Sequence, residues 1–262
     1  MSSDSLPLSP LLPRNALVTG GARRLGRAIC LALADAGFRV GIHCHTSETE
    51  AAALADEIGD AATVIRADLA DEAQTATLVA RTAAALGPVG VLVNNASTFD
   101  RDEWDDATRA SWDHHMEPNL RAPFVLTQGI ALALPADAHG VVINRLDQRV
   151  WSLTPHFMSY TVSKAALWAL TRQMALALAP RIRVNAIGPG PALPSTRQSP
   201  EQFARQAGNV PLGHGTSPDE VGRAVLALLS LPSMTGQMIA LDGGQHLQWS
   251  PVSAAGCETE VE

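Results

Sequence analysis

Short apolar segments alternate with longer amphipathic segments along most of the chain. The first apolar segment, "ALVTG", ends in a glycine turn, and an alanine-rich stretch with helical spacing follows it. Strands are expected at 16–20, 38–44, 62–68, 89–96, 140–146, 182–187 and 237–241. Helices are expected at 24–37, 46–59, 71–86, 110–134, 156–179 and 218–230.

Strands that alternate with helices predict right-handed crossovers and a parallel sheet. We therefore expect one doubly wound, Rossmann-type α/β domain over residues 14–249, with helices on both faces of the sheet. Residues 1–13 contain three prolines and are expected to form a flexible arm, and 250–262 a flexible acidic tail. The Pro- and Gly-rich segment at about 188–216 follows the sixth strand, where such sheets bind ligands, and is expected to be the substrate loop.

The composition of the chain limits the kinds of partner that the protein is expected to bind. The net charge of −7 argues against nucleic acid or an anionic membrane surface, and no apolar run reaches transmembrane length. Three cysteines lie far apart without metal-binding spacing, which favours a reduced, cytoplasmic protein. His114 and His115 are adjacent, so on a helix their side chains diverge, and we expect no metal site.

The first turn, "TGGARRLGRAI", has the spacing of a phosphate-binding loop. Gly20 and Gly26 flank a junction between strand and helix, where glycine lets backbone amides approach a pyrophosphate. A plain helix entry is the alternative. The second strand ends in "HCHTS" with no acid before Glu48, while Arg23 and Arg24 lie in the turn. Cations without a carboxylate favour a 2′-phosphate, and hence NADPH, unless the "HCHTS" residues form an ordinary loop.

The chain has a single tyrosine and a single lysine, Tyr160 and Lys164. They stand four residues apart on an expected helix, so their side chains share one face. A nearby ammonium would lower the pKa of the phenol and make it a usable acid near neutral pH. The alternative is a solvated pair on the surface of the helix.

These motifs together resemble the short-chain dehydrogenase/reductase family over about residues 14–249. The resemblance rests on the glycine turn, "NNA" after the fourth strand, Asn119, the Tyr160–Lys164 pair and "GPG" after the sixth strand. It implies that Asn119, Tyr160 and Lys164 form a proton relay. The cofactor-binding residues it implies, together with those of the turn, are Gly20, Arg23, Arg24, Leu25, Gly26, His45, Thr46, Ser47, Asp68, Leu69, Asn94, Ala96, Ser97, Tyr160, Lys164, Pro189 and Gly190.

Departures from the family pattern indicate a branch of it. Arg24 stands where the family usually has glycine, and Asp147, thirteen residues before Tyr160, stands where it usually has a catalytic serine. With "HCHTS", "NNASTF" and "NLRAPF", these departures resemble the pteridine reductases. That likeness implies that Phe99 stacks on a pterin ring, that Ser97 and Arg24 contact its polar edge, and that Asp147 acts with Tyr160 as a proton donor.

Other roles remain open for these residues. Phe99 could belong to the core, Asp147 could pair with Arg145 or Arg149, and Arg24 could serve only the cofactor phosphates.

The predicted function is reduction of a pterin or dihydrofolate-like ring by NADPH, with Asn119, Asp147, Tyr160 and Lys164 as the catalytic residues. A reductase of ketones or quinones, or an NADPH-binding regulatory protein without turnover, are the alternatives. We also expect a homotetramer, because long alanine-rich helices allow close packing, with Trp249 as a candidate interface residue.

Overall fold

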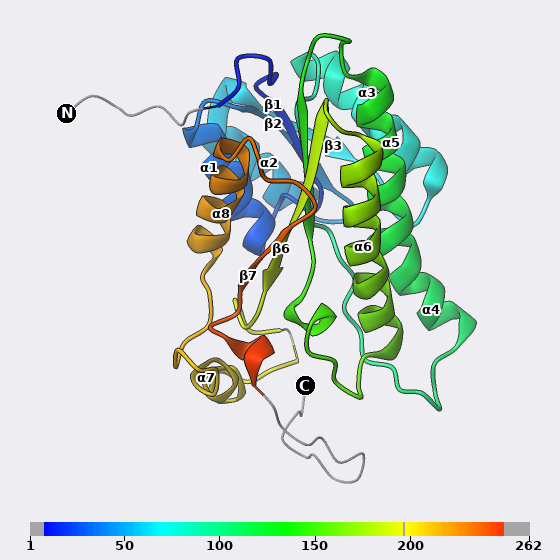
Figure 1. The fold of residues 1–262 in the computed structure, drawn as a ribbon, viewed down its shortest axis with the longest axis vertical. Coiled ribbons are helices and arrows are strands. Elements are labelled where there is room, and N and C mark those ends of the chain that lie inside the picture. The colour runs from blue at the N-terminus through cyan, green and yellow to red at the C-terminus, as the bar shows by residue number, and fades with distance from the viewer. Residues whose placement is uncertain (1–7, 196, 249–262) are drawn as a thin grey trace, which may run out of the picture.

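The computed structural model describes residues 8–195 and 197–248. All strands in this part of the chain pair in parallel in a single sheet, in the order β3-β2-β1-β4-β5-β6-β7 (Figure 1). The strands are β1 (Asn15–Val18), β2 (Arg39–Cys44), β3 (Ala62–Arg66), β4 (Val91–Asn94), β5 (Gly140–Arg145), β6 (Ile182–Pro189) and β7 (Met238–Leu241). Each of these strands lies within two residues of its predicted bounds or inside them.

Helices cover both faces of the sheet (Figure 1). One face carries α1 (Arg24–Asp35), α2 (Glu48–Ile58) and α8 (Pro218–Ser230). The other carries α3 (Glu72–Leu86), α5 (Ala122–Ala133) and α6 (Met158–Ala177). The doubly wound α/β prediction is therefore confirmed.

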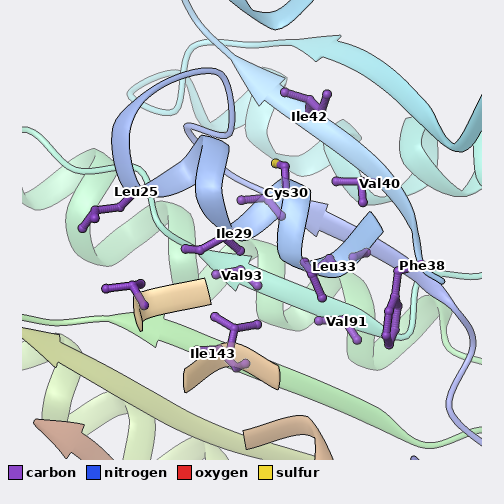
Figure 2. Close-up of a cluster of buried hydrophobic side chains, with 14 of the residues drawn as sticks. Leu25, Ile29, Cys30, Leu33, Phe38, Val40, Ile42, Val91, Val93 and Ile143 are labelled. Carbon is purple, nitrogen blue, oxygen red and sulfur yellow. The ribbon is translucent and has the colours of Figure 1, made fainter. Parts of the chain in front are cut away.

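The first helix explains why the glycine turn is held rigidly. Ile29 and Leu33 on α1 pack on Val91 and Val93 of the central strand, within a cluster shown in Figure 2. All four side chains are essentially excluded from solvent. Because burial of one such side chain contributes about 1.5–3 kcal/mol, the helix that follows the turn is firmly anchored to the sheet.

The strand order reverses at β1. The chain builds β1, β2 and β3 outward in one direction, then returns to place β4 on the other side of β1. Crossovers on opposite faces leave a crevice at the carboxyl ends of β1 and β4, which is where such sheets bind ligands.

The helix predicted over 110–134 is interrupted in the structure. It consists of α4 (Arg109–Met116), a π-helical turn η2 (Glu117–Arg121) and α5. Pro123 has no N–H to donate to the carbonyl of Asn119 four residues earlier, and the N–H of Ala122 bonds to the carbonyl of Glu117, five residues back. The prolines of this segment thus widen the turn that carries Asn119.

The segment predicted as a substrate loop over 188–216 contains more regular structure than expected. Strand β6 extends to Pro189, and a helix, α7 (Pro200–Gly208), occupies the middle of the segment. Ser199 and Gln202 form a capping box at the start of α7. That Ser-x-x-Gln spacing, with proline at the first helical position, is a sequence signal for a helix start.

The N-terminal arm was predicted to be flexible over residues 1–13, and the structure corrects this for its second half. Leu12 is buried in the core, and the carbonyl of Leu11 accepts a hydrogen bond from the N–H of His139. Residues 1–7, Trp249 and the acidic tail lie outside the described residues. Among the described residues, no helix has the length and apolarity needed to cross a membrane.

Candidate active site

A cleft of about 760 Å³ opens along the carboxyl edge of the sheet. It is lined by residues that follow β1 through β6 and by the segment after Pro189. The predicted site residues that line it are Gly20, Arg23, Arg24, Leu25, Gly26, His45, Thr46, Ser47, Asp68, Leu69, Ala96, Ser97, Phe99, Asp147, Tyr160, Pro189 and Gly190. Three predicted residues, Asn94, Asn119 and Lys164, are buried behind its wall.

Two positions at the turn between β1 and α1 strongly favour glycine. Gly20 adopts a left-handed backbone with φ of 58°, which favours glycine. A Cβ on Gly26 would lie 2.0 Å from the carbonyl oxygen of Gly20. Asn95 binds the same turn, since its side-chain amide donates to the carbonyls of Thr19 and Gly20. Sequence reasoning missed this role of Asn95.

His43 anchors the turn from the second strand. Its Nδ1 accepts a hydrogen bond from the N–H of Gly20 at 3.0 Å, so its Nε2 carries the proton and donates to the carbonyl of Ala67 at 3.1 Å. Burial lowers the pKa of His43 to about 4, which keeps the ring neutral and able to accept. Sequence reasoning grouped His43 with the "HCHTS" residues that favour NADPH. It missed the anchoring role, because the partners of His43 lie more than twenty residues away in the sequence.

Arg24 is one of two non-glycine residues with positive φ among the described residues. Its φ is 53°, a left-handed conformation that costs most residues about 1–2 kcal/mol. The left-handed backbone at this position therefore explains why the resembled family usually has glycine there. In this chain the guanidinium of Arg24 donates to the carbonyls of Leu193 and Pro194, so it tethers the segment after β6 to the turn.

The end of β2 carries no carboxylate that could bind a ribose hydroxyl pair. His45 and Thr46 are exposed and line the cleft. Across the opening, Arg23 lies 3.5 Å from Glu50, and His45 lies 3.8 Å from Asp68. Both pairs are exposed and weak, so the Arg23 and His45 side chains remain available to an anionic group.

Tyr160 and Asp147 meet at the inner end of the cleft. The Tyr160 hydroxyl donates to Oδ2 of Asp147 at 2.9 Å. Oδ1 of Asp147 accepts from the backbone N–H of Arg149 at 2.8 Å, which fixes the carboxylate. The fold therefore brings these two side chains, which are thirteen residues apart in the sequence, into direct contact.

Lys164 does not lower the pKa of Tyr160 as the sequence suggested. Burial and the neighbouring Asp147 carboxylate raise the pKa of Tyr160 well above its usual value. Burial, followed by the Arg145 charge, lowers the pKa of Lys164, whose Nζ donates to the carbonyl of Arg145 at 3.0 Å. The phenol is therefore a firmly protonated donor, and sequence spacing could not reveal the burial that makes it so.

Asn94 and Asn119 hold the walls in place. Asn94 donates to the side chain of Asn144 inside the sheet, so Asn95, and not Asn94, lines the cleft. Asn119 exchanges two hydrogen bonds with the backbone of Thr98 and donates to Ser163. Among the described residues, no hydrogen bond joins Asn119 directly to Tyr160 or Lys164, and its place in a proton relay stays a prediction.

Phe99 lies half-buried on the cleft wall beside Tyr160. Its ring stacks on Phe157 with centroids 4.5 Å apart and planes 7° apart, and it meets Tyr160 edge-on at 4.6 Å. The guanidinium groups of Arg149 and Arg197 lie 5.5 and 5.8 Å from its centre. Phe157 therefore supports one face of the Phe99 ring at the end of the cleft that holds Tyr160, and sequence reasoning missed both Phe157 and Arg197.

The two adjacent histidines point to different partners. His114 contacts the carboxylate of Asp100, whereas His115 turns inward to Ser159. Within the part of the chain that the structure describes, no three His, Cys, Asp or Glu side chains are grouped to bind a metal.

A glycine turn against a parallel sheet, with a buried tyrosine and lysine one helical turn apart, defines a dinucleotide-dependent oxidoreductase fold. A family model described as enoyl-(acyl carrier protein) reductase matches residues 20–246. The chain belongs to the short-chain dehydrogenase/reductase family, and it is an oxidoreductase by that membership.

Three individual proteins are similar to this chain over most of its length. The structure of FolM alternative dihydrofolate reductase 1 from Brucella canis, complexed with NADP, is 48% identical, with a TM-score of 0.90 and coverage of 94% of this chain and 100% of that one. The Brucella suis protein of the same description, also with NADP, is 51% identical at a TM-score of 0.87, covering 90% and 96%. L-xylulose reductase from Bos taurus is 34% identical over 89% of this chain and 97% of that protein.

Proposed function

We propose that this chain is an NADPH-dependent reductase of a pterin or dihydrofolate-like ring. The observation that carries the proposal is the Tyr160–Asp147 hydrogen bond beside the supported ring of Phe99. The similarity to two alternative dihydrofolate reductases gives it independent support.

The first part of the cleft fits a dinucleotide. Gly20 and Gly26 allow close backbone approach, and the described residues provide no side-chain cap for the N-terminus of α1. Its free N–H groups are suited to a pyrophosphate. Arg23, His45 and Thr46 would face a 2′-phosphate, and the solved relatives contain NADP.

The choice of cofactor is directly measurable. Because no carboxylate follows β2 to bind a ribose hydroxyl pair, the phosphorylated cofactor should bind at least about tenfold more tightly than NADH, or about 1.4 kcal/mol. Fluorescence titration gives both dissociation constants. Equal dissociation constants for the two cofactors would contradict the proposal that Arg23, His45 and Thr46 face the 2′-phosphate.

At the proposed substrate end, the Tyr160 hydroxyl holds the proton that reduction of the ring requires. When bound, the nicotinamide would supply a hydride to a ring carbon of a C=N bond. The ring nitrogen then takes one proton, and the Tyr160 hydroxyl, oriented by Asp147, is the donor. Solvent in the cleft restores the proton to the pair. Phe99 would hold the ring in the plane that this transfer needs.

A ketone reductase is the second candidate, because other reductases of the family, such as L-xylulose reductase, share the fold. Asp147 counts against it. The carboxylate that accepts from Tyr160 would repel the alkoxide developing on a reduced ketone, whereas the family serine would donate to that oxygen.

The deciding experiment compares substrates. NADPH consumption is followed with dihydrobiopterin, with dihydrofolate, with simple ketones and quinones, and without substrate. The proposal expects turnover with a dihydropterin ring. Brisk ketone reduction with no pterin turnover would establish the second candidate, and cofactor binding without any turnover would indicate a regulatory protein.

We further propose that the protein assembles as a homotetramer. Leu132 at the end of α5 and Leu176 at the end of α6 are 88% and 83% exposed, although each belongs to a helix that packs on the sheet. Burial of such side chains between subunits would favour association. Light scattering that gave a monomer mass would contradict this assembly.

A further inference from the structure

A chain of buried polar side chains lies behind the cleft wall. Asp102, His115 and Ser159 are 4%, 1% and 0% exposed, and none of them lines the cleft. They come from three separate elements: the segment after β4, helix α4 and the first turn of α6. Buried polar groups are costly unless they are paired, so their contacts need an explanation.

Asp102 caps the helix that carries Tyr160. Its Oδ1 accepts from the N–H of Ser159 at 3.0 Å, and its Oδ2 accepts from the Ser159 hydroxyl at 2.5 Å. The Asp102 carbonyl accepts from the N–H of Met158. The residue before α6, Phe157, has a left-handed backbone and provides no side-chain cap. A carboxylate 57 residues away therefore satisfies the start of α6, where negative charge is also favoured by the helix dipole.

His115 connects this cap to the segment that carries Phe99. Its Nε2 accepts from the backbone N–H of Asp100 at 3.0 Å, so the proton is on Nδ1. Nδ1 lies 2.7 Å from the Ser159 hydroxyl and 3.1 Å from the carbonyl of Ser111. The chain therefore runs in one direction, from the Asp100 amide through His115 and Ser159 to the Asp102 carboxylate.

This order excludes a nucleophilic serine. The Ser159 hydroxyl donates a hydrogen bond to a carboxylate and is fully buried, so it cannot attack a substrate in the cleft. The two ends of the chain adjoin the substrate end instead. Asp100 follows Phe99, Ser159 precedes Tyr160, and the rings of Phe99 and Tyr160 touch.

We propose that Asp102, Ser159 and His115 form a positioning network that sets the Phe99 ring and the Tyr160 hydroxyl in their relative geometry. For its effect on catalysis, the network depends on the roles proposed above for Phe99 and Tyr160. None of the three side chains lines the cleft, so cofactor binding should not depend on them.

The kinetic test separates substrate positioning from general damage. Ser159→Ala and His115→Phe each break the chain, and His115→Gln restores a donor and an acceptor. We expect the two disruptive variants to raise KM for a dihydropterin about tenfold, about 1.4 kcal/mol. The NADPH dissociation constant should stay within about twofold, and His115→Gln should recover most of the loss. His139→Phe, at an exposed histidine away from the cleft, is the matched control.

A spectroscopic test does not depend on knowing the substrate. Tyr160 is the only tyrosine, so protein labelled with ¹³C-tyrosine gives a single ring signal that needs no assignment. Because Ser159 adjoins Tyr160 and holds the first turn of α6, Ser159→Ala should move this signal at neutral pH and start its alkaline titration earlier.

Failure of the two parts can be told apart. If wild-type protein reduces no dihydropterin, the proposed function fails while the tyrosine signal still tests the network. If folded Ser159→Ala and His115→Phe proteins both keep the wild-type tyrosine signal, or if both keep the wild-type KM, the network has no positioning role.

Discussion

The two ends of the cleft are held by different kinds of contact. At the cofactor end, the Gly20 turn is bound by two buried side chains, His43 and Asn95. At the outer rim of the proposed substrate end, Arg197 donates to the carbonyl of Phe99 and to the carboxylate of Asp100, and the two charged side chains are 38% and 55% exposed.

This difference has an energetic meaning. Buried hydrogen bonds with neutral partners are insensitive to salt, and losing one partner leaves the other unsatisfied at a cost of about 1–3 kcal/mol. An exposed ion pair contributes about 0–1 kcal/mol and is screened by salt. The cofactor end is therefore preformed, whereas the rim of the substrate end can open at little cost.

The largest effect should come from Tyr160→Phe, which tests whether the two ends act independently. The fold and the cofactor end survive, but the proton donor is lost, so turnover should fall about a thousandfold. Steady-state rates measure the loss of turnover, and NADPH titration of the same sample measures cofactor binding. Near-wild-type turnover would show that another group donates the proton.

His43 should make the cofactor end sensitive to acid. Its pKa is about 4 in the folded protein and about 6.5 in the unfolded chain. Between these values the unfolded state binds the additional proton, so stability is full above about pH 6.5 and falls as the pH drops towards 4. The loss should be about 3 kcal/mol.

Urea unfolding at pH 7 and pH 4.5 measures this loss, with His43→Gln as the variant that removes the titration and exposed His139→Gln as the control. If wild-type protein and His43→Gln lose stability equally over this range, the buried histidine is not the acid-sensitive anchor.

Gly26→Ala should damage the cofactor end selectively. A methyl group would overlap the Gly20 carbonyl, and relief of that overlap should shift the turn at a cost of about 2 kcal/mol. We expect the NADPH dissociation constant to rise about thirtyfold. Gly208→Ala, where the added Cβ meets nothing within 4 Å, is the control. Unchanged NADPH affinity in Gly26→Ala would show that the turn does not bind the cofactor.

The smallest effect should come from Arg197→Ala at the substrate rim. Because the Arg197–Asp100 pair is exposed, its loss should raise KM for the dihydropterin only about threefold, and the difference should shrink in high salt. Arg205→Ala, on the exposed side of α7, provides the comparison. An effect that persisted in high salt would mean that Arg197 contacts the substrate itself.

Sequence periodicity predicted the sheet well because a strand buried on both faces has a plain apolar signature. It assigned Asn94 to the cofactor site and missed Asn95, since one residue of register moves a side chain from the cleft wall to the interior of the sheet. It also could not predict the pKa of Tyr160. The position of Lys164 is local information, whereas burial and the contact with Asp147 depend on the whole fold.

Arg24 has a left-handed backbone, and its side chain links the turn after β1 to the segment after β6. Glycine would relax the turn but could not reach the carbonyls of Leu193 and Pro194. A ligand that displaces the Arg24 guanidinium would therefore break the hydrogen bonds that hold the segment after β6, which also lines the cleft. Thermodynamic linkage then requires reciprocity: whatever factor the cofactor contributes to substrate affinity, the substrate returns to cofactor affinity.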